Sequence, residues 1–206
     1  MTKTIGVMGL GLMGSAIAAR LLEMRSPVVV WNRTAARAAP LVDAGAEWVE
    51  TPAALFAAAD VVIAITASTA EVEAAVGASG ARLARVDFIN LVTGSPRQVR
   101  ALKGAVEAVG GRFFSGTLQR YPAEIGQAEA LILCAGDEGV WERQADVIRG
   151  LGGAAVNLGA DAAIAPGRPM AWPRTSRLGA SASPTAIRSL RCWAPPRRAR
   201  APRKSS

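Results

Sequence analysis

Residues 6–14 carry the sequence Gly-Val-Met-Gly-Leu-Gly-Leu-Met-Gly, in which the last three glycines have the spacing G-x-G-x-x-G. The run follows residues 4–8, a short apolar segment with a strand pattern, and leads into residues 15–24, which have a helical composition. A site for dinucleotide phosphates requires this order of strand, turn and helix. The first glycine permits a tight turn, the second leaves room for a pyrophosphate, and the third lets the helix pack closely on its strand. The free amides at the helix start would face the phosphates, so we predict contacts from Gly9, Leu10, Gly11, Leu12, Met13 and Gly14.

Segments with strand and helix patterns alternate as far as about residue 160. The predicted strands cover residues 4–8, 28–31, 46–49, 61–65, 86–91, 112–114, 130–134 and 154–158. The predicted helices cover residues 15–24, 35–44, 69–76, 95–109 and 138–149, and another begins at the Thr-Pro pair 51–52. This alternation predicts an α/β fold, a doubly wound, mainly parallel Rossmann-type sheet with right-handed crossovers and helices on both faces.

Charge is distributed unevenly along the chain. The 206 residues include 24 Lys and Arg against 16 Asp and Glu, a formal net charge of +8. Residues 1–166 hold all 16 acidic residues and 14 of the basic ones, whereas residues 167–206 hold ten basic residues and no acid. The basic character therefore belongs to the C-terminal stretch and says nothing about the partners of the rest.

The C-terminal stretch is rich in Arg, Pro, Ala and Ser and has neither helical nor strand periodicity. We therefore expect a Rossmann domain over residues 1–162 and a tail over residues 163–206. The tail is interpreted either as the product of a frameshift near residues 165–168, which replaced the true C-terminal part, or as a natural disordered basic arm. Such an arm would bind polyanions through counterion release, but its aromatic residues are too scattered for a base-stacking platform. We expect no specific nucleic-acid partner.

Other features argue against several further classes of protein. No signal-peptide pattern is evident at the N-terminus, and the apolar runs are too short for a membrane span. The two cysteines, Cys134 and Cys192, have no disulfide-framework or metal-ligand spacing. The chain contains no histidine, which excludes a histidine relay and a histidine metal site. We expect a cytoplasmic protein with neither a metal nor a membrane partner.

The end of the second predicted strand indicates which dinucleotide binds. An NAD site places Asp or Glu about twenty residues beyond the glycines to hold the ribose hydroxyls, but no carboxylate occurs between Glu23 and Asp43. The strand ends instead in Trp-Asn-Arg-Thr at residues 31–34, with another arginine one helical turn later. Arginine can pair with a 2′-phosphate or lie flat on the adenine. We predict that NADP(H) is the cofactor and that Asn32, Arg33, Thr34 and Arg37 contact it; the alternative is that the two arginines are ordinary solvated helix charges.

Ligands of open α/β sheets lie at the carboxyl ends of the strands. We therefore predict that Ile65 and Thr66, at the end of the fourth strand, and Thr93, after the fifth, lie beside the cofactor. Either threonine could instead be a helix cap or a turn residue.

Three motifs together resemble the N-terminal domain of the 6-phosphogluconate/β-hydroxyacid dehydrogenase superfamily. They are Gly-Leu-Gly-Leu-Met-Gly at 9–14, Trp-Asn-Arg-Thr at 31–34 and Asn-Leu-Val-Thr-Gly-Ser-Pro at 90–96. The resemblance covers about residues 3–160.

Within that superfamily, residues 114–126 and 130–137 are most similar to the NADPH-dependent imine reductases. The corresponding loop of those enzymes ends in a Tyr-Pro and an Ile-Gly pair, as Tyr121-Pro122 and Ile125-Gly126 do here. The β-hydroxyacid dehydrogenases carry an Asp-x-Pro-x-Ser-Gly-Gly stretch at this place, which the chain lacks. They also use a lysine as general acid/base on the helix that joins their two domains, and this chain has no lysine between Lys103 and Lys204.

The resemblance implies hydride transfer from NADPH to the carbon of a C=N bond, with a small-molecule imine or carbonyl compound as substrate. In the family an all-helical C-terminal domain supplies the proton donor, most of the substrate pocket and the dimer. Residues 167–206 have no counterpart of that domain, so the catalytic residue stays unassigned and a family-type homodimer is not expected. Two hypotheses follow: an imine-reductase-like oxidoreductase that is inactive as this truncated chain, and a non-catalytic NADP(H)-binding module.

Overall fold

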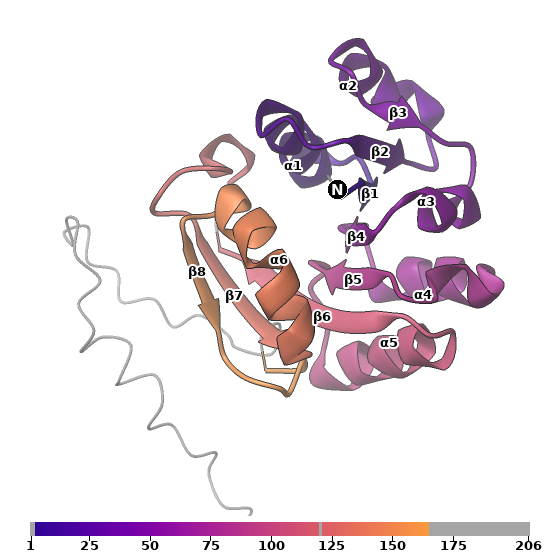
Figure 1. Ribbon diagram of the computed structural model, residues 1–206, viewed down its shortest axis with the longest axis vertical. Helices are drawn as coiled ribbons and strands as arrows, with labels where there is room; N and C mark the ends of the chain where they lie inside the picture. Colours follow the sequence, from indigo (N-terminus) through magenta and orange to yellow (C-terminus); the bar gives the residue numbers. More distant parts are fainter. Residues whose placement is uncertain (1–2, 120, 165–206) are drawn as a thin grey trace, which may run out of the picture. The chain divides into compact units, whose positions relative to one another are not determined.

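The fold is built on an eight-stranded sheet with strand order β3-β2-β1-β4-β5-β6-β7-β8 (Figure 1). The computed structural model describes residues 3–119 and 121–164. The strands are β1 Ile5–Met8, β2 Val28–Trp31, β3 Glu47–Trp48, β4 Val61–Ala64, β5 Asp87–Asn90, β6 Arg112–Leu118, β7 Leu131–Gly136 and β8 Ala154–Asn157. The α-helices are α1 Leu12–Glu23, α2 Ala39–Asp43, α3 Pro52–Ala58, α4 Thr69–Gly77, α5 Pro96–Ala108 and α6 Glu138–Leu151. Short 3₁₀ helices cover Ala35–Ala38, Gly80–Leu83 and Pro122–Glu124. Of the tail predicted over residues 163–206, residues 165–206 lie outside the described residues.

Each face of the sheet is covered by its own layer of helices. Along β1, Ile5 and Val7 face a core shared with α1, α2 and α6, whereas Met8 faces a second core shared with α3, α4 and α5. Figure 1 shows α3, α4 and α5 following one another along one side of the sheet. Alternation of apolar side chains between two covered faces is the pattern of a doubly wound α/β fold. The predicted Rossmann-type architecture is confirmed.

The chain reverses direction once in the sheet. All neighbouring strands from β3 to β6 are parallel, β7 runs antiparallel to β6, and β8 is again parallel to β7. A parallel pair needs a crossover, usually a helix, but among the described residues between β6 and β7, 119 and 121–130, the only helix is the short Pro122–Glu124 segment. The sheet is therefore mainly parallel, as predicted, and the last strands extend it as expected.

The helix predicted over residues 35–44 is interrupted. Residues 35–38 form a 3₁₀ helix, and α2 starts only at Ala39, with Pro40 in its first turn. Proline lacks an amide hydrogen and its ring clashes with the preceding turn, so a helix running through residue 40 would lose a hydrogen bond there. By contrast, α1 begins three residues earlier than predicted, at Leu12.

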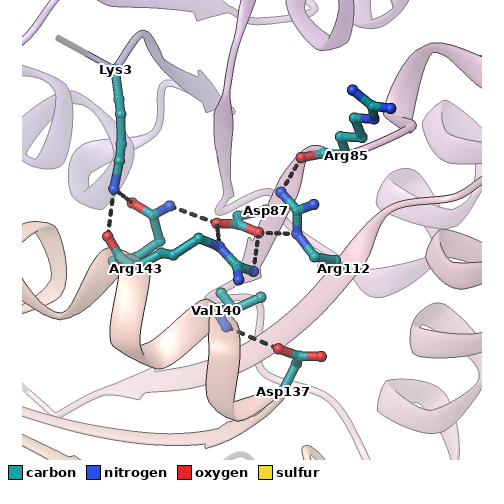
Figure 2. A network of polar contacts seen from close by, with 8 residues as sticks. Lys3, Arg85, Asp87, Arg112, Asp137, Val140 and Arg143 are labelled. Atoms are coloured by element: carbon teal, nitrogen blue, oxygen red, sulfur yellow. Dashed lines mark hydrogen bonds and ion pairs between the residues drawn. The ribbon is translucent and has the colours of Figure 1, made fainter. Parts of the chain in front are cut away.

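A buried carboxylate fastens α6 to the amino-terminal edge of the sheet. The Asp87 side chain, 2% exposed at the start of β5, accepts hydrogen bonds from Arg143 Nε (3.0 Å) and Nη2 (2.9 Å), from Gln144 Nε2 (2.6 Å) and from Arg112 Nε (2.5 Å). Figure 2 shows this network, with Lys3 donating to the Arg143 carbonyl. Burial alone would raise the pKa of Asp87, but the donors on Arg143, Gln144 and Arg112 outweigh it and hold that pKa below its usual value.

No helix within residues 3–119 and 121–164 is both long and apolar enough to cross a membrane.

Candidate functional site

A cleft of about 680 Å³ opens at the edge of the sheet where β1, β2 and β4 end. Strand order reverses at β1, and ligands of open α/β sheets bind at such a switch point, beyond the carboxyl ends of the strands. The cleft is lined by Met8, Gly9, Leu10, Gly11, Leu12, Met13, Gly14, Trp31, Asn32, Arg33, Thr34, Arg37, Pro52, Ile65, Thr66, Ala67, Glu71, Ala74 and Ala75. Twelve of the thirteen residues predicted to contact the cofactor are therefore brought together; Thr93 is the exception.

Two glycines of the turn after β1 are required by the backbone itself. Gly9 has φ +100°, and a Cβ there would lie 2.5 Å from the carbonyl oxygen of Ile65. A Cβ at Gly14 would overlap the carbonyl oxygen of Gly9. The first glycine thus permits the turn, and the third lets α1 rest directly on it, as predicted.

The middle glycine has a different role. Gly11 adopts φ −74° and ψ −171°, which any residue tolerates, and a Cβ there would have no atom within 4 Å. The space in front of its backbone is therefore open toward the cleft. This is the cradle that a pyrophosphate requires and that a side chain would fill.

The start of α1 supplies hydrogen-bond donors to that space. Gly11 caps the helix without a side-chain hydrogen bond, and the first amides of a helix have no carbonyl one turn earlier to bond to. These amides and the positive end of the helix dipole favour an anion. The Leu12 side chain, 84% exposed at the first helical position, also lines the cleft.

Asn32 ties the glycine turn to the end of β2. Its Oδ1 accepts from the Leu10 amide at 2.9 Å, and its Nδ2 donates to the Thr34 carbonyl at 3.0 Å. The Gly9 amide also donates to the Trp31 carbonyl at 2.9 Å. Asn32 therefore fixes the two loops that border the cleft; its direct contact with the cofactor stays a prediction.

The charged groups of the cleft gather where β2 ends. Arg33 and Arg37 project from the loop and 3₁₀ helix after β2, and the side chain of Arg33 is 83% exposed. Arg33 Nη1 lies 3.3 Å from Oε1 of Glu71, which belongs to the first turn of α4. Glu71 was not predicted as a site residue, because only the fold brings α4 opposite the end of β2.

Thr66 lines the cleft and also holds the loop before α4. Its Oγ1 donates to the Ser68 carbonyl at 2.9 Å, and the Ser68 side chain accepts from the Glu71 amide as the N-cap of α4. The turn role considered for Thr66 is thus present alongside its place in the cleft. Thr93 is exposed in the loop after β5 and does not line the cleft.

The other lining residues that sequence reasoning missed are apolar: Met8, Trp31, Pro52, Ala67, Ala74 and Ala75. Two of them, Ala74 and Ala75, are small residues of α4, whose place in the cleft no short motif encodes. Within the described part of the chain, no group of three or more potential ligands is placed to hold a metal ion.

Two known proteins are similar in sequence to about two thirds of this chain. It is 37% identical over 137 residues to the NADPH-dependent reductive aminase of Aspergillus oryzae, which covers 66% of the chain and 46% of that protein. It is 34% identical over 145 residues to the cytokine-like nuclear factor N-PAC of Xenopus tropicalis, covering 68% of the chain and 27% of that protein.

The solved structure of another reductive aminase is also similar to this chain. The reductive aminase of Aspergillus terreus, in complex with NADPH4, cyclohexanone and allyl amine, matches with a TM-score of 0.76 at 36% identity, over 81% of this chain and 58% of that one. The chain spans less than two thirds of the length of each of these three proteins.

The model of one domain family extends over almost the whole described region. It is the NAD binding domain of 6-phosphogluconate dehydrogenase, and it matches residues 4–159. The match includes the glycine turn, the end of β2 and every lining residue of the cleft. The predicted superfamily and its NAD(P)-binding domain are confirmed, and the chain belongs to the family of NAD-binding domains of 6-phosphogluconate dehydrogenase.

Proposed function

We propose that this chain binds NADP(H) in the cleft and is the cofactor-binding part of an imine-reductase-like oxidoreductase. The observation that carries the proposal is the charge at the end of β2: Arg33 and Arg37 line the cleft, and residues 24–42 contain no carboxylate. A 2′-phosphate carries roughly two negative charges at neutral pH. We call the part of the cleft beside the end of β2 its adenosine end, because the adenosine of the cofactor would lie there. Two arginines at this end attract the phosphate, whereas the Asp or Glu of an NAD site would repel it.

The residues of the cleft fit the other parts of the cofactor. The uncapped start of α1 and the open space at Gly11 suit a pyrophosphate. The space between the end of β2 and α4 suits an adenine, with Arg33 able to lie on its face. Bound NADPH would supply a hydride; the residues described here bind and orient it.

The proposed reaction is reduction of an imine or carbonyl carbon by that hydride. Support comes from the similarity to two reductive aminases, one of them in complex with a ketone and an amine. A non-catalytic NADP(H)-binding module is the second candidate. Two observations support this second candidate: among the described residues that line the cleft, Glu71 is the only acidic one, and one relative, N-PAC, is named as a nuclear factor.

Titration of the full 206-residue chain with NADPH and NADH, followed by fluorescence or calorimetry, tests the cofactor. We expect tighter binding of NADPH, and a loss of about ten- to a hundredfold in NADPH affinity for Arg33→Ala, the range for a charge-assisted pair. NADH affinity should change less than about threefold, because the lost interaction is with the 2′-phosphate. Arg97→Ala, which removes an exposed arginine of α5 outside the cleft, is the control. Equal affinities for NADPH and NADH would contradict the proposal.

Oxidation of NADPH in the presence of cyclohexanone and allyl amine distinguishes the two candidates. Turnover supports the oxidoreductase. Retained NADPH binding without turnover for a panel of ketones, amines and cyclic imines supports the binding module.

A further inference from the structure

An ion pair crosses the adenosine end of the cleft. Arg33 Nη1 and Glu71 Oε1 are 3.3 Å apart, and both residues line the cleft. The arginine comes from the loop after β2 and the glutamate from the first turn of α4, so the pair joins the two sides of the opening. Any anion that Arg33 binds is therefore brought close to a carboxylate.

The position of Glu71 is fixed by the loop before it. Its amide donates to the Ser68 hydroxyl at 3.3 Å, and Thr66 holds the Ser68 carbonyl at 2.9 Å. The carboxylate also lies in the first turn of α4, near the positive end of the helix dipole. Among the described residues that line the cleft, Glu71 is the only one with a carboxylate.

We propose that Glu71 is a specificity-determining residue that weakens binding of the 2′-phosphate and so sets how strongly the site discriminates NADPH from NADH; this inference rests on the proposed function. Glu71 competes with the phosphate for the Arg33 guanidinium, and its charge repels the phosphate from across that guanidinium. NADH carries a hydroxyl in place of the phosphate and experiences neither effect. The Glu71 carboxylate therefore lowers the preference for NADPH that Arg33 and Arg37 give the site.

The size of the effect follows from the charges. Two like charges on opposite sides of a guanidinium are roughly 7 Å apart, about one Debye length at physiological salt, and both are hydrated. The competing Arg33–Glu71 pair is largely exposed, with side chains 83% and 40% accessible, so it is worth little by itself. Removing the charge of Glu71 should therefore lower the NADPH dissociation constant by about three- to tenfold at low salt, and by less at physiological salt.

The test is the Glu71→Gln variant of the full chain, titrated with NADPH and NADH at low and at physiological salt. Glutamine keeps the length and polarity of the side chain and removes only its charge. We expect NADPH to bind about three- to tenfold more tightly at low salt and NADH affinity to change less than about twofold. Glu73→Gln removes the same charge from α4 outside the cleft lining and should leave the ratio of the two affinities unchanged.

Combining the change with Arg33→Ala tests the route of the effect. Without Arg33, Glu71→Gln should improve NADPH binding less than it does in the wild-type chain, because the competition is gone. The inference is overturned if Glu71→Gln weakens NADPH binding, leaves it unchanged, or strengthens NADPH and NADH equally. Failure of the wild-type chain to bind NADPH at all would overturn the proposed function as well, so the two failures are distinguishable.

Discussion

Replacing Gly11 and Gly14 by alanine, one at a time, should separate cofactor binding from folding. The two glycines belong to the same turn, but only one is needed by the protein itself. A Cβ at Gly14 overlaps the Gly9 carbonyl oxygen, whereas a Cβ at Gly11 meets no atom within 4 Å. Gly11→Ala should therefore impair binding alone, and Gly14→Ala should impair folding.

The magnitudes follow from these surroundings. At Gly14 alanine improves helix propensity by about 1 kcal/mol, but overlap with a backbone atom costs up to about 3 kcal/mol, which leaves a net loss of about 2 kcal/mol. For a domain of this size that corresponds to a decrease of about 4–8 °C in Tm. At Gly11 the φ of −74° suits alanine, so stability should change by less than about 0.5 kcal/mol. A Cβ in front of the phosphates removes at least one charge-assisted hydrogen bond, about 1.5–3 kcal/mol, or roughly ten- to a hundredfold in affinity.

Thermal unfolding followed by circular dichroism, together with NADPH titration, measures both quantities on the same samples. Gly11→Ala should keep the wild-type Tm and lose NADPH affinity. Gly77→Ala, at the end of α4 and with no atom near its Cβ, is a control that should leave NADPH affinity unchanged and should not lower the Tm, because alanine favours the helix. Wild-type NADPH affinity in Gly11→Ala would show that the phosphates do not approach this backbone. An unchanged Tm in Gly14→Ala would show that α1 does not rest on the turn.

Three further results are expected. Asp87→Asn should destabilise the chain by about 2–4 kcal/mol at pH 7, since it leaves Arg112 and Arg143 without their buried anion. Because the folded state lowers the pKa of Asp87, its stabilising effect should be present above the unfolded pKa of about 3.9 and decrease as the pH falls through the lower folded-state pKa; a Tm difference between wild type and variant that does not shrink as the pH is lowered from about 6 would contradict this. Asn32→Ala should raise the dissociation constants of NADPH and NADH by similar factors and cost about 1–2 kcal/mol of stability, because the Leu10 amide and Thr34 carbonyl lose their partner; a selective loss of NADPH would instead assign Asn32 to the 2′-phosphate. Burial raises the pKa of the Cys134 thiol to about 12, so in a Cys192→Ser background a thiol reagent at pH 8 should label Cys134 only after unfolding, and rapid labelling of the native chain would refute its burial.

Local patterns were sufficient to predict most of the fold. Short β-branched runs such as Val28–Trp31 and the glycine turn are specified by neighbouring residues, and the structure has a strand and a turn at both places. β6 extends to Leu118, four residues beyond its predicted end. The interruption of the helix at residues 38–39 follows from Pro40, whose missing amide hydrogen outweighs the helical composition of residues 35–44. The reversed direction of β7 could not be predicted from periodicity, because strand direction depends on the connection and not on the pattern of the strand.

The site was predictable where it is built from one segment of the chain. The glycine turn and the end of β2 are continuous stretches, and their residues line one cleft. Glu71 is 38 positions beyond Arg33, and nothing in either segment indicates that they meet. The hydrogen bond from the Leu10 amide to Asn32 was missed for the same reason, since Leu10 and Asn32 become neighbours only when β1 and β2 pair.

The double anchorage of Asn32 has a consequence for redesign of cofactor preference. Changing such a site to accept NADH ordinarily means placing an aspartate at the end of the second strand. At position 32 an aspartate would still accept from the Leu10 amide, but its second oxygen would oppose the Thr34 carbonyl in place of donating to it. An aspartate at position 32, introduced to bind NADH, would thereby loosen the loop after β2 that carries Arg33. A change of coenzyme preference at this position therefore also changes the rigidity of that loop.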